Sequence, residues 1–319
     1  MRPLKVYKKL ILVILFLTFL SMLFFVWPVS SQPTLQTIII QPDGSIYPDT
    51  APIQRSGNTY TFTENISAAV KILKSNIVLD GTGYTLSGPY NGTLSDIWVI
   101  GQGANQLPQS TLEQYVIGVD LANSSVNGVT IENINIRNFS IGMYMWTQNN
   151  TIKGNDVSDN IVGILLSGSN TTITKNYISN NQRGLFFGFN IPGQTPSDIT
   201  VNQNDFEDNV VQLIGCQCKA YNISEPPHNW DNGHLGNHWG DYNGTDTNHD
   251  GIGDTPYTID VVDRDRFPLM QSPAQPPIPQ SQVSMPKIPL EAIILFVSVP
   301  TLLAATAIAF KHKRKTQSS

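Results

Sequence analysis

Basic side chains are scarce through most of this sequence, and that scarcity excludes one class of partner. Eight of the 19 Lys and Arg residues flank two apolar runs near the chain ends, which leaves 11 basic against 23 acidic residues in Gln32–Lys287. Nucleic-acid binding depends on clustered Lys and Arg that contact phosphates. This acidic segment, with a net charge of −12, therefore does not have nucleic acid as its partner.

The same segment lacks the long apolar-periodic stretches that helical repeats would need. Its apolar residues alternate instead over short β-branched stretches such as Ile134–Ile136, and Asn, Gly, Asp and Ser separate these stretches. Such alternation indicates strands and turns. The segment is therefore predicted to be all-β.

Four copies of one unit lie between Ile131 and Gly215. Aligning them gives three apolar columns, which are Ile131, Ile152, Ile173 and Val201, then Ile136, Val157, Ile178 and Phe206, then Met143, Ile164, Leu185 and Leu213. A unit of this length cannot bury its own apolar residues, so the copies must stack. The pattern predicts a parallel β-helix, a solenoid whose successive coils pair as parallel strands about 4.8 Å apart. Val119 and Leu121 rejoin the columns of Met143 and Met145 one coil earlier.

Polar residues repeat with the same spacing. Two asparagine columns align, formed by Asn155, Asn176 and Asn204 and by Asn160, Asn181 and Asn209. Asn tolerates the left-handed backbone of tight bends, and stacked amides can donate from one coil to the next. A glycine column, Gly142, Gly163 and Gly184, predicts a further bend.

Both chain ends carry apolar runs. Leu10–Trp27 follows a basic head and predicts a secretory signal cleaved before Gln32, or an uncleaved anchor. Ile288–Phe310 precedes the basic sequence KHKRK, which predicts a transmembrane helix with a cytoplasmic tail and a protein displayed on the cell surface. The predicted organisation is signal or anchor (1–31), β-helix (32–215), capping segment (216–270), Pro-rich stalk (271–287), transmembrane helix (288–310) and basic tail (311–319).

Eight N-x-S/T sequons fit an extracellular location. They are candidates for N-glycosylation, although an Asn-rich and Thr-rich β-helix also produces such sequences by chance. The candidates are Asn65, Asn91, Asn123, Asn138, Asn149, Asn170, Asn222 and Asn243.

Two stretches carry a family resemblance. NIVLDGTGYTLSG (Asn76–Gly88) resembles the opening coil of NosD-like, or CASH-type, right-handed parallel β-helix proteins. Asn229–Met270 is similar to the closing segment of archaeal and bacterial cell-surface members. The resemblance covers most of Thr37–Met270 and implies the fold. It does not imply the copper-insertion role behind the family name, because most relatives share only the solenoid.

Two functions are compatible with this sequence. One is non-catalytic display or binding, with a saccharide or envelope polymer as the partner. The other is a polysaccharide lyase, epimerase or hydrolase, which needs acid and base groups on one outward face. Acidic and basic residues on nearby coils are Asp156, Asp159, Asp205, Glu207 and Asp208, with Lys175 and Arg183. Asp159 and Asp208, however, lie in a turn row (SDNI, SNNQ, EDNV), where acids are ordinary solvated turn residues.

The enzyme hypothesis lacks its usual residues. Ile131–Gly215 contains no histidine, and the Asp-Pro-His cluster of the related epimerases and the Gly-His-Gly element of the polygalacturonases are absent. An anionic glycan also fits poorly with an acidic segment. No catalytic residue is therefore assigned. In the loop Pro89–Gln114, Trp98, with Tyr115 just beyond it, would either stack on sugar rings or pin the loop to the solenoid.

The capping segment contains a candidate calcium loop. Oxygen-bearing side chains occupy loop positions one, three, five and nine, with Gly251 at position six, as in the first part of an EF-hand loop. Tyr257 replaces the acid at position twelve, so the alternative is a plain Asp-Gly turn run. The candidate ligands are Asp246, Asn248, Asp250 and Asp254.

Softer ligands also occur in the capping segment. Cys216 and Cys218 lie near His228, His234 and His238, but their spacing matches no standard zinc or copper site. No bound copper or zinc is expected. The two cysteines could instead form a strained disulfide.

Overall fold

The computed structural model describes residues 35–90, 116–123, 125–188, 196–214, 228–260 and 263–273. All its strands belong to the unit that begins at Thr37. The described residues contain no helix, and so none that could cross a membrane. The predicted signal segment (1–31), transmembrane helix (288–310) and tail lie outside the described residues.

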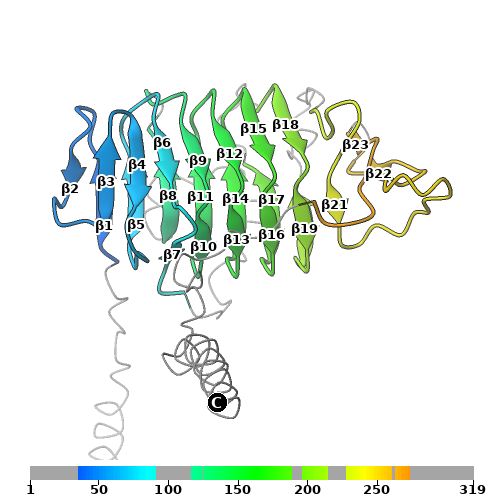
Figure 1. Cartoon of the computed structure of the whole chain (residues 1–319), viewed down its shortest axis with the longest axis horizontal. Helices are drawn as coiled ribbons and strands as arrows, with labels where there is room; N and C mark the ends of the chain where they lie inside the picture. The colour runs from blue at the N-terminus through cyan, green and yellow to red at the C-terminus, as the bar shows by residue number, and fades with distance from the viewer. Residues whose placement is uncertain are drawn as a thin grey trace, which may run out of the picture. The chain divides into compact units, whose positions relative to one another are not determined.

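Three sheets form the walls of a solenoid, and successive coils add one strand to each (Figure 1). Sheet A has the order β2 (Ile46–Tyr47), β1 (Thr37–Ile40), β5 (Ala69–Ile72), β8 (Ile117–Leu121), β11 (Ile141–Met145), β14 (Val162–Leu166), β17 (Arg183–Phe187) and β20 (Val211–Ile214). Sheet B has the order β18 (Ile199–Asn202), β15 (Thr171–Thr174), β12 (Thr151–Lys153), β9 (Thr130–Glu132), β6 (Val78–Asp80), β4 (Thr59–Phe62) and β3 (Ile53–Ser56).

Sheet C joins the solenoid to the capping segment. Its order is β21 (His238–Trp239), β19 (Asp205–Glu207), β16 (Tyr177–Ser179), β13 (Asp156–Ser158), β10 (Asn135–Arg137) and β7 (Thr85–Ser87). Pairing in the three sheets is parallel except for β1 with β2 and β3 with β4. A separate antiparallel hairpin in the cap consists of β22 (Tyr257–Thr258) and β23 (Arg264–Asp265). The prediction of an all-β parallel solenoid is confirmed.

The three apolar columns read from the sequence are the observed strand registers. Ile152 pairs with Ile131 and Ile173, Val157 with Ile136 and Ile178, and Ile164 with Met143 and Leu185. These side chains are fully buried. Val119 and Leu121 pair with Met143 and Met145, as expected one coil earlier. The core is thus a stack of aliphatic layers, with one layer for each coil.

The first asparagine column, between sheets B and C, forms a continuous ladder. Asn155 Nδ2 donates to Asn176 Oδ1, and Asn176 Nδ2 to Asn204 Oδ1, each at 2.9 Å. Each amide also donates to a backbone carbonyl of the preceding coil, such as Ile152. Backbone N–H groups at the bend donate to the asparagine Oδ1 of the following coil. The ladder therefore satisfies backbone groups that a tight bend would otherwise leave unpaired.

The glycine column does not form the bend predicted from the sequence. Gly142, Gly163 and Gly184 lie inside β11, β14 and β17, and none has a positive φ. A Cβ on Gly163 would lie 2.6 Å from the Gly184 carbonyl oxygen and 3.1 Å from Asn181 Nδ2. These positions lack a side chain because a backbone carbonyl oxygen of the next coil, and then the second asparagine column, fill the space beside them.

The cap closes the end of the core with aromatic rings and a buried carboxylate. Trp239 stacks on Phe206 on one side, with ring centroids 4.6 Å apart, and on Tyr257 on the other, at 4.3 Å. Asn237 extends the first asparagine ladder, because Asn204 Nδ2 donates to it. Its backbone N–H then donates to Asp265, which also accepts from Trp239 Nε1. Burial raises the pKa of Asp265 to about 6 despite these donors.

The stacked core predicts a severe effect of a buried charge. Ile178→Asp places an unpaired carboxylate in a fully buried layer, which should destabilise the fold by more than about 4 kcal/mol. Asn180→Asp, at an exposed turn two residues away, is the matched control and should melt within a few degrees of the parent protein. Thermal melting followed by circular dichroism measures both. Equal melting temperatures for the two variants would contradict the assigned register.

The asparagine ladder predicts that a substitution at Asn176 destabilises the fold less than Ile178→Asp does. Asn176→Ala removes the acceptor of Asn155 and the donor to Asn204 and leaves buried polar groups unpaired, at a cost on the order of 3 kcal/mol. Thr172→Ala, on the outer face of the same coil, should cost less than about 1 kcal/mol. Chemical denaturation of the two variants gives the difference. Equal unfolding free energies for the two variants would show that the ladder does not stabilise the fold.

Candidate functional site

The outer face of sheet C gathers the polar and charged side chains of five consecutive strands. Two columns flank the interior column of Ile136, Val157, Ile178, Phe206 and Trp239. One contains Asn135, Asp156, Tyr177, Asp205 and His238, and the other contains Arg137, Ser158, Ser179 and Glu207. Because strand side chains alternate between faces, both columns face away from the core.

Three half-buried groups on this face are each held by a carboxylate of a neighbouring coil. The Arg137 guanidinium forms an ion pair with Asp156, and His238 Nδ1 lies 2.6 Å from Asp205 Oδ1. The Tyr177 hydroxyl donates to Glu207 Oε2 at 3.1 Å. Asp156 and Asp205 are buried, whereas the Arg137 side chain is 40% exposed. We call Arg137, Tyr177, Glu207 and His238 the sheet C strip.

The electrostatics of the strip follow from these pairs. The hydrogen bond to Asp205 raises the pKa of His238, and burial opposes that effect. Burial also raises the pKa of Tyr177, so its phenol stays protonated and can donate. The strip therefore presents the Arg137 guanidinium, an imidazole whose protonated form Asp205 favours, and the Glu207 carboxylate, to which the Tyr177 phenol donates. From β10 to β21 it spans roughly 19 Å, at about 4.8 Å for each coil.

The candidate acidic residues lie in two groups, on sheet C and in turns, and Asp159 and Asp208 occupy the turns expected from the sequence. Asp156, Asp205 and Glu207 converge on sheet C, whereas Asp159 and Asp208 occupy turns with φ of 58° and 53°. Lys175 also lies in such a turn, with φ of 57°. Arg183 lies on β17 of sheet A. Two of the five predicted acids are therefore turn residues outside the strip.

Sequence reasoning named Glu207 as a candidate acid, named His238 only as a weak metal candidate, and did not single out Arg137 or Tyr177. His238 lies outside the repeats and follows Asp205 by 33 residues. The cap returns it to the solenoid, where it pairs in register with Asp205. Asn237 could have predicted the position of His238 from the sequence, because Asn237 continues the asparagine column and His238 is the next residue.

The candidate calcium ligands lie on one exposed loop. Asp246 accepts from the backbone N–H groups of Asp250 and Gly251, and Asp254 accepts from Thr247 N and Thr245 Oγ1. Asn248 Nδ2 donates to Asp250 Oδ2. Among the described residues, no three His, Cys, Asp or Glu side chains are arranged to hold a metal ion. The calcium site stays a prediction.

The described histidines near the two cysteines have separate environments. His228 is buried and packs against Phe187, with ring centroids 4.8 Å apart. His234 is exposed, and His238 belongs to the strip. Cys216, Cys218, Trp98 and Tyr115 lie outside the described residues. The structure therefore gives no joint site for copper or zinc in the residues that it describes.

Six of the eight sequon asparagines are described. Asn65, Asn149, Asn170 and Asn243 are exposed, whereas Asn123 and Asn138 are half-buried. Asn170 Nδ2 donates to Asn149 Oδ1 on the preceding coil, so a glycan on Asn170 would replace one of the two hydrogens of that donor. Asn91 and Asn222 lie outside the described residues. Glycosylation at these sites stays a prediction.

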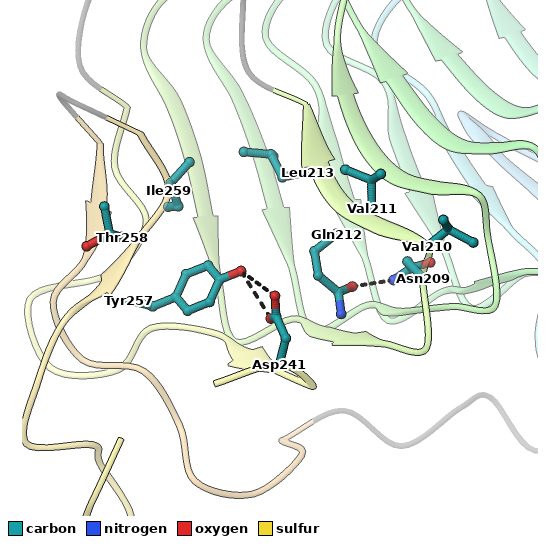
Figure 2. Close-up of a pocket in the computed structure, with 9 residues that line it drawn as sticks. All are labelled: Asn209, Val210, Val211, Gln212, Leu213, Asp241, Tyr257, Thr258 and Ile259. Carbon is teal, nitrogen blue, oxygen red and sulfur yellow. Dashed lines mark hydrogen bonds between the residues drawn. The ribbon is translucent and has the colours of Figure 1, made fainter. Parts of the chain in front are cut away.

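A hollow of about 340 Å³ lies between the last coil and the cap (Figure 2). Residues Asn209–Leu213 line one side, and Asp241 and Tyr257–Ile259 line the other. The Tyr257 hydroxyl donates to Asp241, and Asn209 Nδ2 donates to Gln212 Oε1. The hollow thus combines an apolar strand edge with a carboxylate and an amide.

A family model described as "Right handed beta helix region" matches residues 90–225. The solenoid is a right-handed β-helix. The matched segment contains the four coils with the clearest columns and most of the sheet C strip. Comparison with curated proteins gave no match, and neither did comparison with solved structures.

The pairing of His238 with Asp205 predicts pH-dependent stability of this β-helix. Asp205 and Glu207 raise the pKa of His238 above 6.5 in the folded state, so the stabilisation is complete below pH 6.5 and is lost as the pH rises through the raised value. Unfolding free energies measured from pH 6 to 9 should fall, and His238→Gln should flatten that fall. Burial raises the pKa of Asp265 to about 6, so its own contribution to the unfolding free energy falls as the pH rises from about 4 to 6, below the range in which His238 acts. An identical slope in the variant would disprove the pairing.

Proposed function

We propose that this chain is a membrane-anchored cell-surface protein whose β-helix binds a saccharide or envelope polymer without catalysis. The support for anchoring is in the sequence, in the two apolar runs Leu10–Trp27 and Ile288–Phe310 with their basic flanks. A relation to the NosD-like cell-surface proteins rests on the stretches Asn76–Gly88 and Asn229–Met270.

One observation carries the binding proposal: the half-buried groups of the sheet C strip are fixed by partners on adjacent coils. Arg137, Tyr177 and His238 each have a carboxylate that restrains their rotamers. Because these side chains are already ordered, binding a ligand costs less conformational entropy. Rigid strands also hold such groups in place better than loops do. The strip is long enough for several units of a linear polymer that lies along the solenoid axis.

The charge around the strip restricts the class of ligand that can bind there. The segment Gln32–Lys287 carries a net charge of −12, which repels anionic polymers at a distance. Arg137 and His238 offer donors, whereas Glu207 and the Tyr177 oxygen, whose proton is donated to Glu207, offer acceptors. An uncharged, hydroxyl-rich glycan matches this set, because each hydroxyl both donates and accepts.

A glycan array tests the proposal. The full-length chain, solubilised in a mild detergent, should bind uncharged glycans, and Glu207→Gln should weaken binding about tenfold, or about 1.4 kcal/mol. Glu132→Gln is the matched control, because Glu132 also lies on an outer face and pairs with the next coil through Lys153 at 2.8 Å. The control should bind like the parent chain. No binding, or equal losses in both variants, would refute the strip as the site.

A lyase, epimerase or hydrolase remains the second candidate, and one arrangement favours it. Buried Asp205 orients His238 beside Glu207, and an oriented imidazole next to a carboxylate can transfer protons. Against it, Asp156 and Asp205 are buried and already paired. Analysis of the array glycans for cleaved or epimerised products decides between the two functions. Product that disappears in His238→Gln would establish the enzyme.

A further inference from the structure

A hydrophobic cluster separate from the core lies on the outer face of sheet A. Its members are Ile141, Tyr144, Val162 and Leu165. Tyr144 and Leu165 each lie between two residues of β11 and β14 that face the core, so their side chains point outward. Tyr144 pairs with Leu165 on the next coil, and Ile141 pairs with Val162. We call these four residues the sheet A patch.

The sheet A patch is buried although it faces outward. Ile141, Tyr144 and Val162 are 0% exposed, and Leu165 is 4% exposed. Strand side chains stand roughly perpendicular to their sheet, so neighbours on the same face cover them from the sides and not from above. A further part of the molecule therefore lies over the patch. A single chain buries these residues, so the cover belongs to the same chain and not to a partner.

Exposure rises on both sides of the patch. Toward the N-terminal end of the stack, Asp120 is paired in register with Tyr144 and forms an ion pair with Lys71, whose side chain is 40% exposed. Toward the C-terminal end, Phe186 is half-buried and Val211 is 41% exposed. The cover is therefore centred on β11 and β14 and does not extend over β20.

One connection between sheets C and A is much longer than the others. Residues 138–140 join β10 to β11, and residues 159–161 join β13 to β14. Residues 88–116 join β7 to β8. The excess lies in residues 91–115, for which the sequence predicts a loop that leaves the coil. These residues lie outside the described part of the chain.

Both ends of this segment are fixed beside the patch. Tyr90 N donates to the Asn138 carbonyl at 2.9 Å, and the Val116 carbonyl accepts from Ser140 N and Ile141 N at 3.0 and 3.2 Å. The segment therefore leaves and rejoins the solenoid at the turn that leads into β11. Residues 91–115 can extend roughly 40 Å from that turn and return. A five-residue strand is only about 16 Å long, so the segment is long enough to cross the patch.

The composition of the segment suits this face. Residues 91–115 contain the apolar run Ile97–Ile100, two acidic residues (Asp96 and Glu113) and no Lys or Arg. Arg183 pairs with Val162 at the margin of the patch, and its Nη1 is buried without a hydrogen-bond partner among the described residues. A covering segment with basic residues would repel this guanidinium, whereas residues 91–115 bring no like charge to it.

We propose that residues 91–115 dock on the outer face of sheet A and cover the sheet A patch. Of the two roles open to Trp98, this is the one that pins the segment to the solenoid. Residues 189–195 and 215–227 also adjoin sheet A, but they follow β17 and β20, where the outer face is more exposed. Sheet A is then closed to ligands, so a polymer that binds the solenoid uses another face.

Thiol labelling of the full-length chain in mild detergent tests the proposal. Leu165→Cys places a thiol in the patch, and Ile164→Cys places the matched control in the core, on the same strand. Replacing residues 91–115 with Gly-Ser-Gly should raise the rate of maleimide labelling at Leu165→Cys at least tenfold and leave Ile164→Cys protected. Peptide mapping separates these thiols from the native cysteines. Labelling of Leu165→Cys that stays slow would assign the cover to another segment and overturn the proposal.

Photo-cross-linking of the intact chain decides the question even if the replacement unfolds the coils. p-Benzoylphenylalanine in place of Phe186, which packs against the patch, should form cross-links within one chain to peptides from residues 91–115. The same photo-residue in place of Thr172, on the outer face of sheet B, is the control and should not reach them. A residue at position 186 that cross-links only to other segments or to a second chain, or to nothing, would refute the docking.

Discussion

The hydrogen bond from one asparagine amide to the amide one coil further on is the interaction that the fold depends on. Each coil must bend sharply between its strands, and each bend exposes backbone N–H and C=O groups that the strands cannot pair. Asn155, Asn176 and Asn204 bind these groups from inside the bend and pass a hydrogen bond to the next coil. The bend therefore holds its shape only when a neighbouring coil is present, which makes the coils mutually dependent.

That dependence explains why so much of the fold can be read from sequence. A ladder and an aliphatic layer both require the same residue type at a fixed spacing, so the registers of Ile152, Val157 and Ile164 follow from the columns. The glycine column was misinterpreted because absence of a side chain has two causes in a solenoid. A glycine can permit a left-handed bend, or it can make room for a neighbour, here Asn181 beside Gly163.

The site was harder to predict than the fold, for a physical reason. Asp205 and Glu207 could be placed on the outer face of sheet C from the period of their coils. His238 could not, because it belongs to a segment without repeats, and its position depends on how Asn237 and Asp265 end the ladder. Three of the four residues of the sheet C strip thus lie in the repeats, and the cap supplies the fourth, His238.

The cap also shows what closing a β-helix requires. It covers the core with Trp239 between Phe206 and Tyr257, and it places a carboxylate with a pKa of about 6 where the next asparagine would stand. Keeping Asp265 buried costs desolvation, which the donors from Asn237 and Trp239 only partly offset. The described cap nevertheless leaves the outer edge of β20 unpaired. Closure in the described residues is therefore concentrated where the end of the stack would otherwise expose most: the last rung of the amide ladder, which Asn237 and Asp265 terminate, and the last core layer, which Trp239 covers.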